Sequence, residues 1–198
     1  MEVLFLGGHP AADFLNTRPT PQGIAVELIG DGAAFLRWLQ SAGLVDAASA
    51  AALRRRPGQA LDAAAAEARA LREWVRDWMA RWREAPAASH AREMRQLNAL
   101  LGQARWTRQA IATKQGIRLR ESCRLESPED LVALVAAQIA ALVAEESPAL
   151  VKRCAGGDCN LWFVDRTKAH QRVYCSAAGC GNRAKVAAFR QRQRDAKA

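Results

Sequence analysis

The clearest pattern of hydrophobic and polar positions lies between about residues 59 and 84. Leu61, Ala68, Val75 and Trp82 fall seven residues apart, with charged residues between them. A second apolar row interleaves with the first and consists of Ala64, Leu71 and Trp78. Two such rows predict a long amphipathic helix whose apolar stripe faces a core.

Weaker patterns predict further helices on either side of this one. Asp31 and Asp46 precede apolar-periodic segments and are suited to cap helices over about 33–42 and 46–56. Further helices are expected to open at His9, Ser89 and Ser127.

The pattern changes between residues 106 and 121. Ile117-Arg118-Leu119-Arg120 alternates apolar and charged residues, as a half-exposed strand does. Lys114-Gln115-Gly116 is a plausible turn from an earlier strand, Trp106 to Thr113. The sequence therefore predicts a small β-hairpin within a mainly helical region.

Trp74, Trp78 and Trp82 follow one another at steps of four residues on the long helix. They could form a stacking platform for bases or a ligand box. On so regular a helix we interpret them as core residues packed against neighbouring helices.

Four of the five cysteines form two pairs with the same spacing, Cys154 with Cys159 and Cys175 with Cys180. Four thiolates make the closed tetrahedral ligand set that structural zinc prefers, and they leave no open position for catalysis. Two disulfides are the alternative, but they need an oxidising compartment. Met1-Glu2-Val3 lacks the basic region of a secretion signal, so we expect a cytoplasmic protein that binds one structural zinc ion.

The residues between the pairs suggest how the metal site is built. Leu161 to Val164 is expected to be a short strand, and Arg172 to Tyr174 its returning partner. Cys180 would then open a helix beginning near Asn182, whose free amides and dipole stabilise a thiolate. A knuckle, a hairpin and a helix carrying the last ligand form a treble-clef arrangement.

At this point the sequence resembles a known family. Cys180-Gly181-Asn182-Arg183, with Phe163-Val164-Asp165-Arg166-Thr167 before it, is similar to the signature of the CGNR zinc fingers, over about Val151 to Arg194. Thr167 stands where serine is usual, and Tyr174 where tryptophan is usual.

The N-terminal region also carries a resemblance. Gly7-Gly8-His9 and Asp13-Phe14-Leu15-Asn16-Thr17 resemble the ABATE domain that accompanies these fingers. The resemblance implies a bacterial transcription regulator.

Charge is unevenly distributed along the chain. Residues 1–150 hold 18 Lys/Arg and 17 Asp/Glu, whereas residues 151–198 hold 11 Lys/Arg and 3 Asp/Glu. A basic domain of this size favours an anionic partner, with nucleic acid first. A solubilising tail is the alternative.

The expected contact surface lies on the C-terminal helix and the turn before it. Val186 and Phe189 are expected to face inward, with cations on both flanks. The candidate nucleic-acid-binding residues are Lys168, Arg172, Arg183, Lys185, Arg190, Arg192 and Arg194. Arg183 is so close to Cys180 that it could hold the finger together by bonding to backbone carbonyls.

Three polar residues near the N-terminus allow two interpretations. His9, Asp13 and Asn16 could line a small-molecule pocket, or they could bond to nearby backbone groups. We favour the second.

Together these patterns predict a mainly α protein with a small β-hairpin: a helical domain over 1–150 and a treble-clef-like zinc finger over 151–198. A DNA-binding transcription regulator is the favoured function. An RNA-binding protein and a protein-interaction module with a purely structural zinc are alternatives, and a small-molecule effector and a homodimer stay open. We expect no enzyme, because the sequence has three histidines, no phosphate-binding glycine loop and no Gly-x-Ser-x-Gly elbow.

Overall fold

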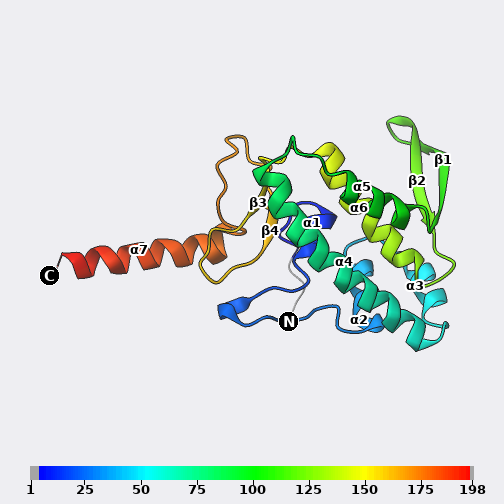
Figure 1. The fold of residues 1–198 in the computed structure, drawn as a ribbon, viewed down its shortest axis with the longest axis horizontal. Helices are drawn as coiled ribbons and strands as arrows, with labels where there is room; N and C mark the ends of the chain where they lie inside the picture. Colours follow the sequence, from blue (N-terminus) through cyan, green and yellow to red (C-terminus); the bar gives the residue numbers. More distant parts are fainter. Residues whose placement is uncertain (1–4, 197–198) are drawn as a thin grey trace. The chain divides into compact units, whose positions relative to one another are not determined.

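The computed structural model describes residues 5–196 of the chain (Figure 1). Met1 to Val3, on which the expected location depends, lie outside the described residues. The chain forms two compact units, one running up to Leu28 and resuming at Leu142, the other running from Ile29 to Ala141. The sequence-based boundary after residue 150 stays a prediction.

The second unit is mainly helical. Its helices are α2 (Gly32–Ser41), α3 (Ala47–Leu53), α4 (Gly58–Glu84), α5 (Ala91–Leu101) and most of α6 (Asp130–Glu145). Asp31 caps α2 by accepting a bond from the Ala34 amide at 2.7 Å, and Asp46 caps α3 through the Ser49 amide at the same distance. Both predicted caps are confirmed.

The apolar stripe of α4 is buried as the heptad pattern predicted. Trp78 and Trp82 are buried, and Trp74 is half-buried with its ring centroid 5.6 Å from that of Trp78. The indole N–H of Trp78 donates to Nδ1 of His90 at 3.2 Å. The interpretation of these tryptophans as mainly core residues is confirmed.

A close approach of two helices sets the packing of α2 on α4. A Cβ added to Gly32 would lie 2.4 Å from the backbone carbon and from the Cβ of Leu61. The Gly32 amide donates to the Asp62 carboxylate at 2.8 Å, so the first turns of the two helices are also bonded to each other.

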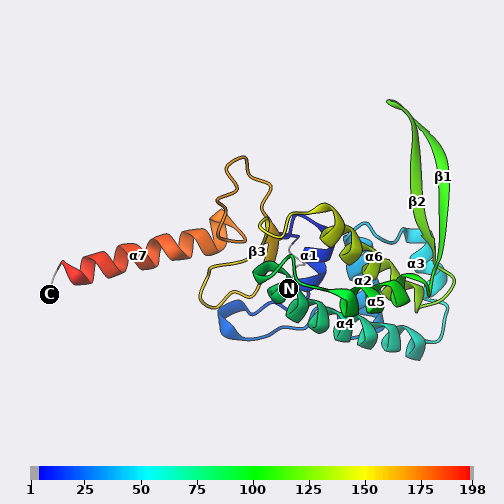
Figure 2. The same ribbon diagram turned by 45° about the horizontal axis from the view of Figure 1, so that its top comes forward.

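The predicted hairpin is present. Strands β1 (Arg105–Thr113) and β2 (Gly116–Arg124) pair antiparallel, with Thr113 opposite Gly116 across the turn. In Figures 1 and 2 the ribbon projects away from the helices of its unit.

The first unit contains the cysteine cluster. Its elements are α1 (Pro10–Leu15), the short η1 turn (Pro21–Gly23), β3 (Val151–Arg153), β4 (Trp162–Val164), the η2 turn (Ala177–Gly181) and α7 (Asn182–Asp195). Helix α1 packs against β4.

The strand pairing within the finger differs from the prediction. β4 pairs with β3, with Val151 opposite Val164, and not with the Arg172–Tyr174 segment. Cys154 and Cys159 therefore lie in the connection of the β3–β4 hairpin, and the ladder continues through a bond from the Cys154 amide to the Leu161 carbonyl at 2.8 Å. Val173 contributes one backbone bond, accepting from the Ala155 amide at 2.9 Å.

The C-terminal helix has the predicted limits but not the predicted inward stripe. Val186 is 40 % exposed and Phe189 is 56 % exposed, and α7 has no buried residue. Two apolar residues one turn apart are too few to fix a helix this rich in cations against the finger, so the expectation was wrong.

Among residues 5–196, no helix combines the length and the apolar character needed to cross a membrane.

Candidate metal centre

The four paired cysteines converge on one point. Each contributes a sulfur atom, and all four atoms lie within 4.8 Å of one another. Sγ of Cys175 is 3.8 Å from Sγ of Cys159 and 3.5 Å from Sγ of Cys180. Tetrahedral zinc with Zn–S bonds of about 2.3 Å places its sulfurs about 3.8 Å apart, whereas a disulfide needs about 2.0 Å.

All four cysteines are free thiols. The structure therefore fits one structural zinc ion held by Cys154, Cys159, Cys175 and Cys180 and does not fit the disulfide alternative. With four protein ligands, the centre would serve folding and not catalysis.

Local backbone geometry brings each pair together. In the first pair, the Cys159 amide bonds the Gly156 carbonyl at 3.0 Å, which closes the knuckle. A Cβ on Gly156 would lie 3.3 Å from Sγ of Cys180, so this position favours glycine. In the second pair, the Ser176 hydroxyl accepts from the Gly179 amide at 3.1 Å and begins the turn that carries Cys180 into α7.

N–H groups surround the sulfur atoms. Sγ of Cys154 accepts from the Cys175 amide at 3.3 Å and from the Gly156 amide at 3.5 Å. Sγ of Cys180 accepts from the Arg183 guanidinium at 2.9 Å. Arg183 therefore helps to hold the finger together, through a cysteine sulfur and not through the carbonyls that the sequence suggested.

The thiols shift one another's pKa. The hydrogen bond with Cys175 lowers the pKa of Cys159 to about 5. The same bond, reinforced by burial, raises the pKa of Cys175, and burial raises that of Cys180. Without a cation the cluster therefore resists full ionisation, and a divalent metal would remove this barrier because coordination deprotonates a thiol.

Asp165 organises the loop that follows β4. One carboxylate oxygen accepts from the amide and the hydroxyl of Thr167 at 3.1 and 2.6 Å. The other accepts from the Arg172 amide at 2.8 Å and from the Lys152 ammonium at 2.7 Å.

Burial alone would raise the pKa of Asp165, but these four donors outweigh it and hold the pKa well below the usual range. Asp165 therefore has a structural role, because it accepts from the backbone amides of Thr167 and Arg172, whereas the Thr167 hydroxyl bonds the Asp165 carboxylate and no backbone amide. Lys152 also belongs to this network, and sequence reasoning missed it. No local pattern around a lysine on β3 indicates that it bonds to a carboxylate thirteen residues away.

Several contacts hold the Arg172 side chain against β4 and the neighbouring loops. Its guanidinium lies 4.2 Å from the centroid of the Phe163 ring and donates to the carbonyls of Tyr174 at 2.9 Å and Leu6 at 3.2 Å, with a further bond to Cys175. These contacts give Arg172 a structural role. The other predicted cations, Lys168, Lys185, Arg190, Arg192 and Arg194, are exposed.

The N-terminal segment closes the free edge of β4. The side-chain amide of Asn16 accepts from the Trp162 amide at 2.7 Å and donates to the Trp162 carbonyl at 2.8 Å, as a neighbouring strand would. The Gly7 carbonyl accepts from the Val164 amide at 2.7 Å. Sequence reasoning missed this pairing, because no local signal links residues 146 positions apart.

The other two polar residues of the N-terminal motif also bond to backbone. Nδ1 of His9 accepts from the Ala11 amide at 3.1 Å at the start of α1. The buried Asp13 carboxylate accepts from the Gly7 amide at 2.7 Å. Burial lowers the pKa of His9, and burial raises that of Asp13 to about 6 although the Gly7 bond opposes it. A ligand pocket lined by His9, Asp13 and Asn16 stays a prediction.

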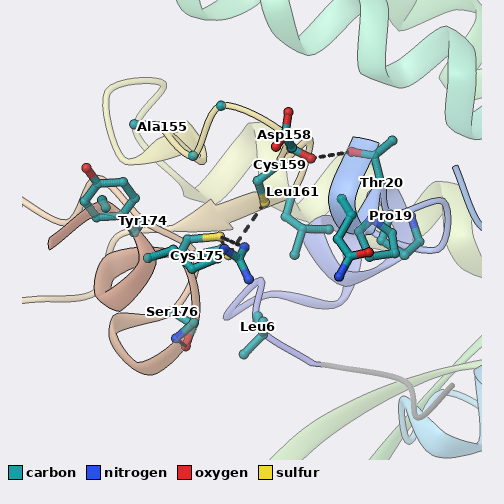
Figure 3. Close-up of a pocket in the computed structure, with 18 of the residues that line it drawn as sticks. Leu6, Pro19, Thr20, Ala155, Asp158, Cys159, Leu161, Tyr174, Cys175 and Ser176 are labelled. Carbon is teal, nitrogen blue, oxygen red and sulfur yellow. Dashed lines mark hydrogen bonds between the residues drawn. The ribbon is translucent and has the colours of Figure 1, made fainter. Parts of the chain in front are cut away.

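A cavity of about 700 Å³ opens beside the cysteine cluster (Figure 3). Pro19 and Thr20 line one side, and the other side is formed by Tyr174, Cys175 and Ser176. Asn16 borders this cavity, and His9 and Asp13 do not.

The fold and site define a protein that carries a four-cysteine zinc finger, with an N-terminal segment packed on the finger's sheet. Residues 151–193 match the CGNR zinc finger family. Residues 8–146 match the ABATE family, described as "Putative stress-induced transcription regulator". This match spans more than half of the chain, which therefore belongs to the ABATE family. No curated protein matches the chain.

Proposed function

We propose that the protein is a DNA-binding transcription regulator and that α7 contacts the phosphate backbone. Its families are regulatory and zinc-finger families, which supports a zinc-binding regulator. The observation that carries the proposal is α7 itself, which is 14 residues long, has no buried residue and stands clear of the rest of its unit in both ribbon views. Such a regulator would act in the cytoplasm.

The charge on α7 is almost entirely of one sign. The helix carries five cations, Arg183, Lys185, Arg190, Arg192 and Arg194. Its one carboxylate, Asp195, accepts from the Gln191 side chain at 2.8 Å. A solubilising surface usually mixes both signs, so an exposed helix of single sign favours a polyanionic partner.

The contacts of these cations separate their proposed roles. Arg190 and Arg194 lie one turn apart on one flank, and we assign them to phosphates. Lys185 and Arg192, two turns apart on another flank, are secondary contacts, with Lys168 extending the surface from the turn. Arg183 is engaged by a cysteine sulfur and so contributes less to binding.

A salt titration with mixed-sequence duplex DNA tests this assignment. Removing two phosphate contacts in Arg190→Ala/Arg194→Ala should lower the slope of log K against log salt by about two and weaken binding to all sequences alike. Alanine keeps helix propensity high, so α7 should persist.

Arg92→Ala/Arg95→Ala is the matched control, because it removes the same charge from exposed positions of α5. Zinc content is measured in each protein. An Arg190→Ala/Arg194→Ala slope equal to that of wild type and of the control would contradict the α7 assignment. Tighter binding of single-stranded RNA than of duplex would favour the RNA-binding alternative.

The exposed Val186 and Phe189 favour a second candidate, a protein-interaction module in which zinc only stabilises a docking surface. Under that alternative, wild-type protein would show no salt-dependent binding to any nucleic acid, and Phe189→Ala would weaken an association that Arg190→Ala/Arg194→Ala leaves intact. A small-molecule effector, if one binds, has the cavity beside the cysteine cluster available to it.

A further inference from the structure

The β1–β2 hairpin is exposed on both faces over most of its length. Ile117 is 82 % exposed and Leu119 is 77 % exposed, whereas Ile111 is half-buried, as are residues near the base, where the Trp106 indole donates to the Leu101 carbonyl at 2.9 Å. Nine residues in each strand make a ribbon about 30 Å long. An isolated two-stranded ribbon is marginally stable in water, so its exposed length suggests a surface that a partner covers.

The strand register sorts the side chains of the ribbon into two different faces. Residues opposite each other across the ladder share a face, and alternate residues along a strand share it too. One face carries mainly apolar pairs, such as Ala110 with Leu119 and Ala112 with Ile117. The opposite face carries Arg105 with Arg124, Thr107 with Ser122, Gln109 with Arg120, Ile111 with Arg118 and Thr113 with Gly116.

We call this second surface the arginine face. It holds four arginines and no carboxylate within the hairpin, every residue of which the structure describes. The hairpin's one acidic residue, Glu121, lies on the apolar face and pairs with Arg108 at 3.1 Å. The arginine face therefore carries charge of one sign over the length of the ribbon.

One carboxylate, that of Glu126, partly neutralises the two arginines at the base of this face. Glu126 pairs with Arg124 at 2.8 Å and reaches Arg105 at 3.9 Å. Farther out, Arg118 bonds only the uncharged side chain of Gln115, at 2.7 Å. Arg120 lies near the carboxylate of Asp46, which caps α3 through Ser49 and attracts Arg120 electrostatically.

We propose that the arginine face of β1–β2, centred on Arg118 and Arg120, is a second nucleic-acid contact that binds the phosphate backbone of duplex DNA. The major groove is about 12 Å wide and admits a two-stranded ribbon, and arginine is a common phosphate ligand. Gln109, Thr107 and Ser122 add hydrogen-bonding groups to the same face. This inference rests on the proposed function for its partner class, but not on α7 for its site.

The inference is tested with Arg118→Thr/Arg120→Thr in full-length, zinc-loaded protein. Threonine suits a strand, so the hairpin should persist. With mixed-sequence duplex, the salt slope should fall by about two and affinity at 0.1 M salt should weaken by about tenfold or more. Arg118→Lys/Arg120→Lys keeps the charge and should bind within a few-fold of wild type, which shows that charge and not folding carries the effect.

Arg92→Ala/Arg95→Ala again controls for net charge. A slope for Arg118→Thr/Arg120→Thr equal to that of this control would overturn the inference, and loss of slope in Arg190→Ala/Arg194→Ala alone would leave α7 as the contact. Wild-type protein that binds no duplex would overturn the proposed function and this inference together. A wild-type dimer that becomes monomeric in Arg118→Thr/Arg120→Thr, with the DNA slope unchanged, would place a second copy of the chain on the hairpin and overturn the inference.

Discussion

A buried carboxylate near the N-terminus gives the first unit a pH-sensitive bond. The Asp13 carboxylate on α1 accepts a hydrogen bond from the Gly7 amide. Position 7 requires glycine, because an added Cβ would lie 2.8 Å from the Asp13 nitrogen. Burial is the larger influence and raises the pKa of Asp13 from 3.8 to about 6. The folded protein therefore binds a proton at this site between about pH 4 and 6 that the unfolded chain releases.

The sign of the resulting pH dependence follows from this difference. Stability conferred by the protonated carboxyl is complete below pH 4 and is lost as pH rises through about 6. Asp13→Asn keeps an oxygen acceptor for Gly7 but carries no charge, so it should be more stable than wild type at pH 8 by about 1 kcal/mol, a figure reduced for the solvent screening that remains at this site.

Urea unfolding at pH 8 and at pH 5.5 measures this effect. The advantage of Asp13→Asn should shrink at pH 5.5, where wild type is substantially protonated. His9 titrates nearby but is present in both proteins, so its contribution cancels in the difference. An advantage that is equal at both pH values would show that Asp13 is not the titrating group.

At the residue scale, the sequence predicted positions whose chemistry is local. Paired cysteines and helix caps follow from spacing of a few residues, and the structure contains them. Asn16 and Arg172 could not be assigned in this way. Asn16 completes the edge of a strand 146 residues away, and Arg172 was grouped with surface cations although its contacts are with the Phe163 ring and backbone carbonyls.

At the element scale, the packing of α2 on α4 depends on one glycine. Gly32→Ala would force a Cβ to within 2.4 Å of the Leu61 backbone, and backbone cannot yield as a flexible side chain does. We expect a loss of about 1–3 kcal/mol in the free energy of unfolding. Gly58→Ala is the control, because its Cβ meets nothing within 4 Å at the start of α4 and should be neutral or slightly stabilising. Thermal melts of both variants measure the contrast, and equal melting temperatures would contradict the close approach.

Two errors of sequence reasoning also belong to this scale. Long helices and the β1–β2 hairpin were predicted because periodicity and turn residues act within the element. The strand that pairs with Trp162–Val164 was predicted wrongly, because three-residue strands contain too little alternation of apolar and polar residues to identify a neighbour. Val186 and Phe189 read as an inward stripe, but the structure leaves α7 without a buried face.

At the scale of the whole chain, the near-neutral total charge of residues 1–150 concealed the basic β1–β2 hairpin within them. Residues 1–150 are nearly neutral, with 18 cations and 17 anions, yet the hairpin alone holds six of those cations and one anion. The rest of this region is left with 12 cations and 16 anions. The basic character that the sequence indicated only for residues 151–198 is therefore shared by the β1–β2 hairpin in the other compact unit. The strand register was needed to show that four of the hairpin's arginines lie on one face.

The division of the chain into units predicts how it responds to loss of zinc. Metal ligation supplies most of the folding energy of so small a finger, and the bonds from Asn16 to Trp162 and from Gly7 to Val164 tie the N-terminal segment to it. Chelation of zinc, or Cys175→Ser, should therefore loosen α1 together with β3 and β4, while α4 stays folded in the other unit. Hydrogen exchange should show loss of amide protection over residues 10–17 and 151–165 and little change over 61–82, and zinc should restore protection in the chelated wild type but not in Cys175→Ser. Retained protection of α1 after chelation would show instead that the N-terminal segment folds with the helices and independently of the finger, as a boundary after residue 150 implies.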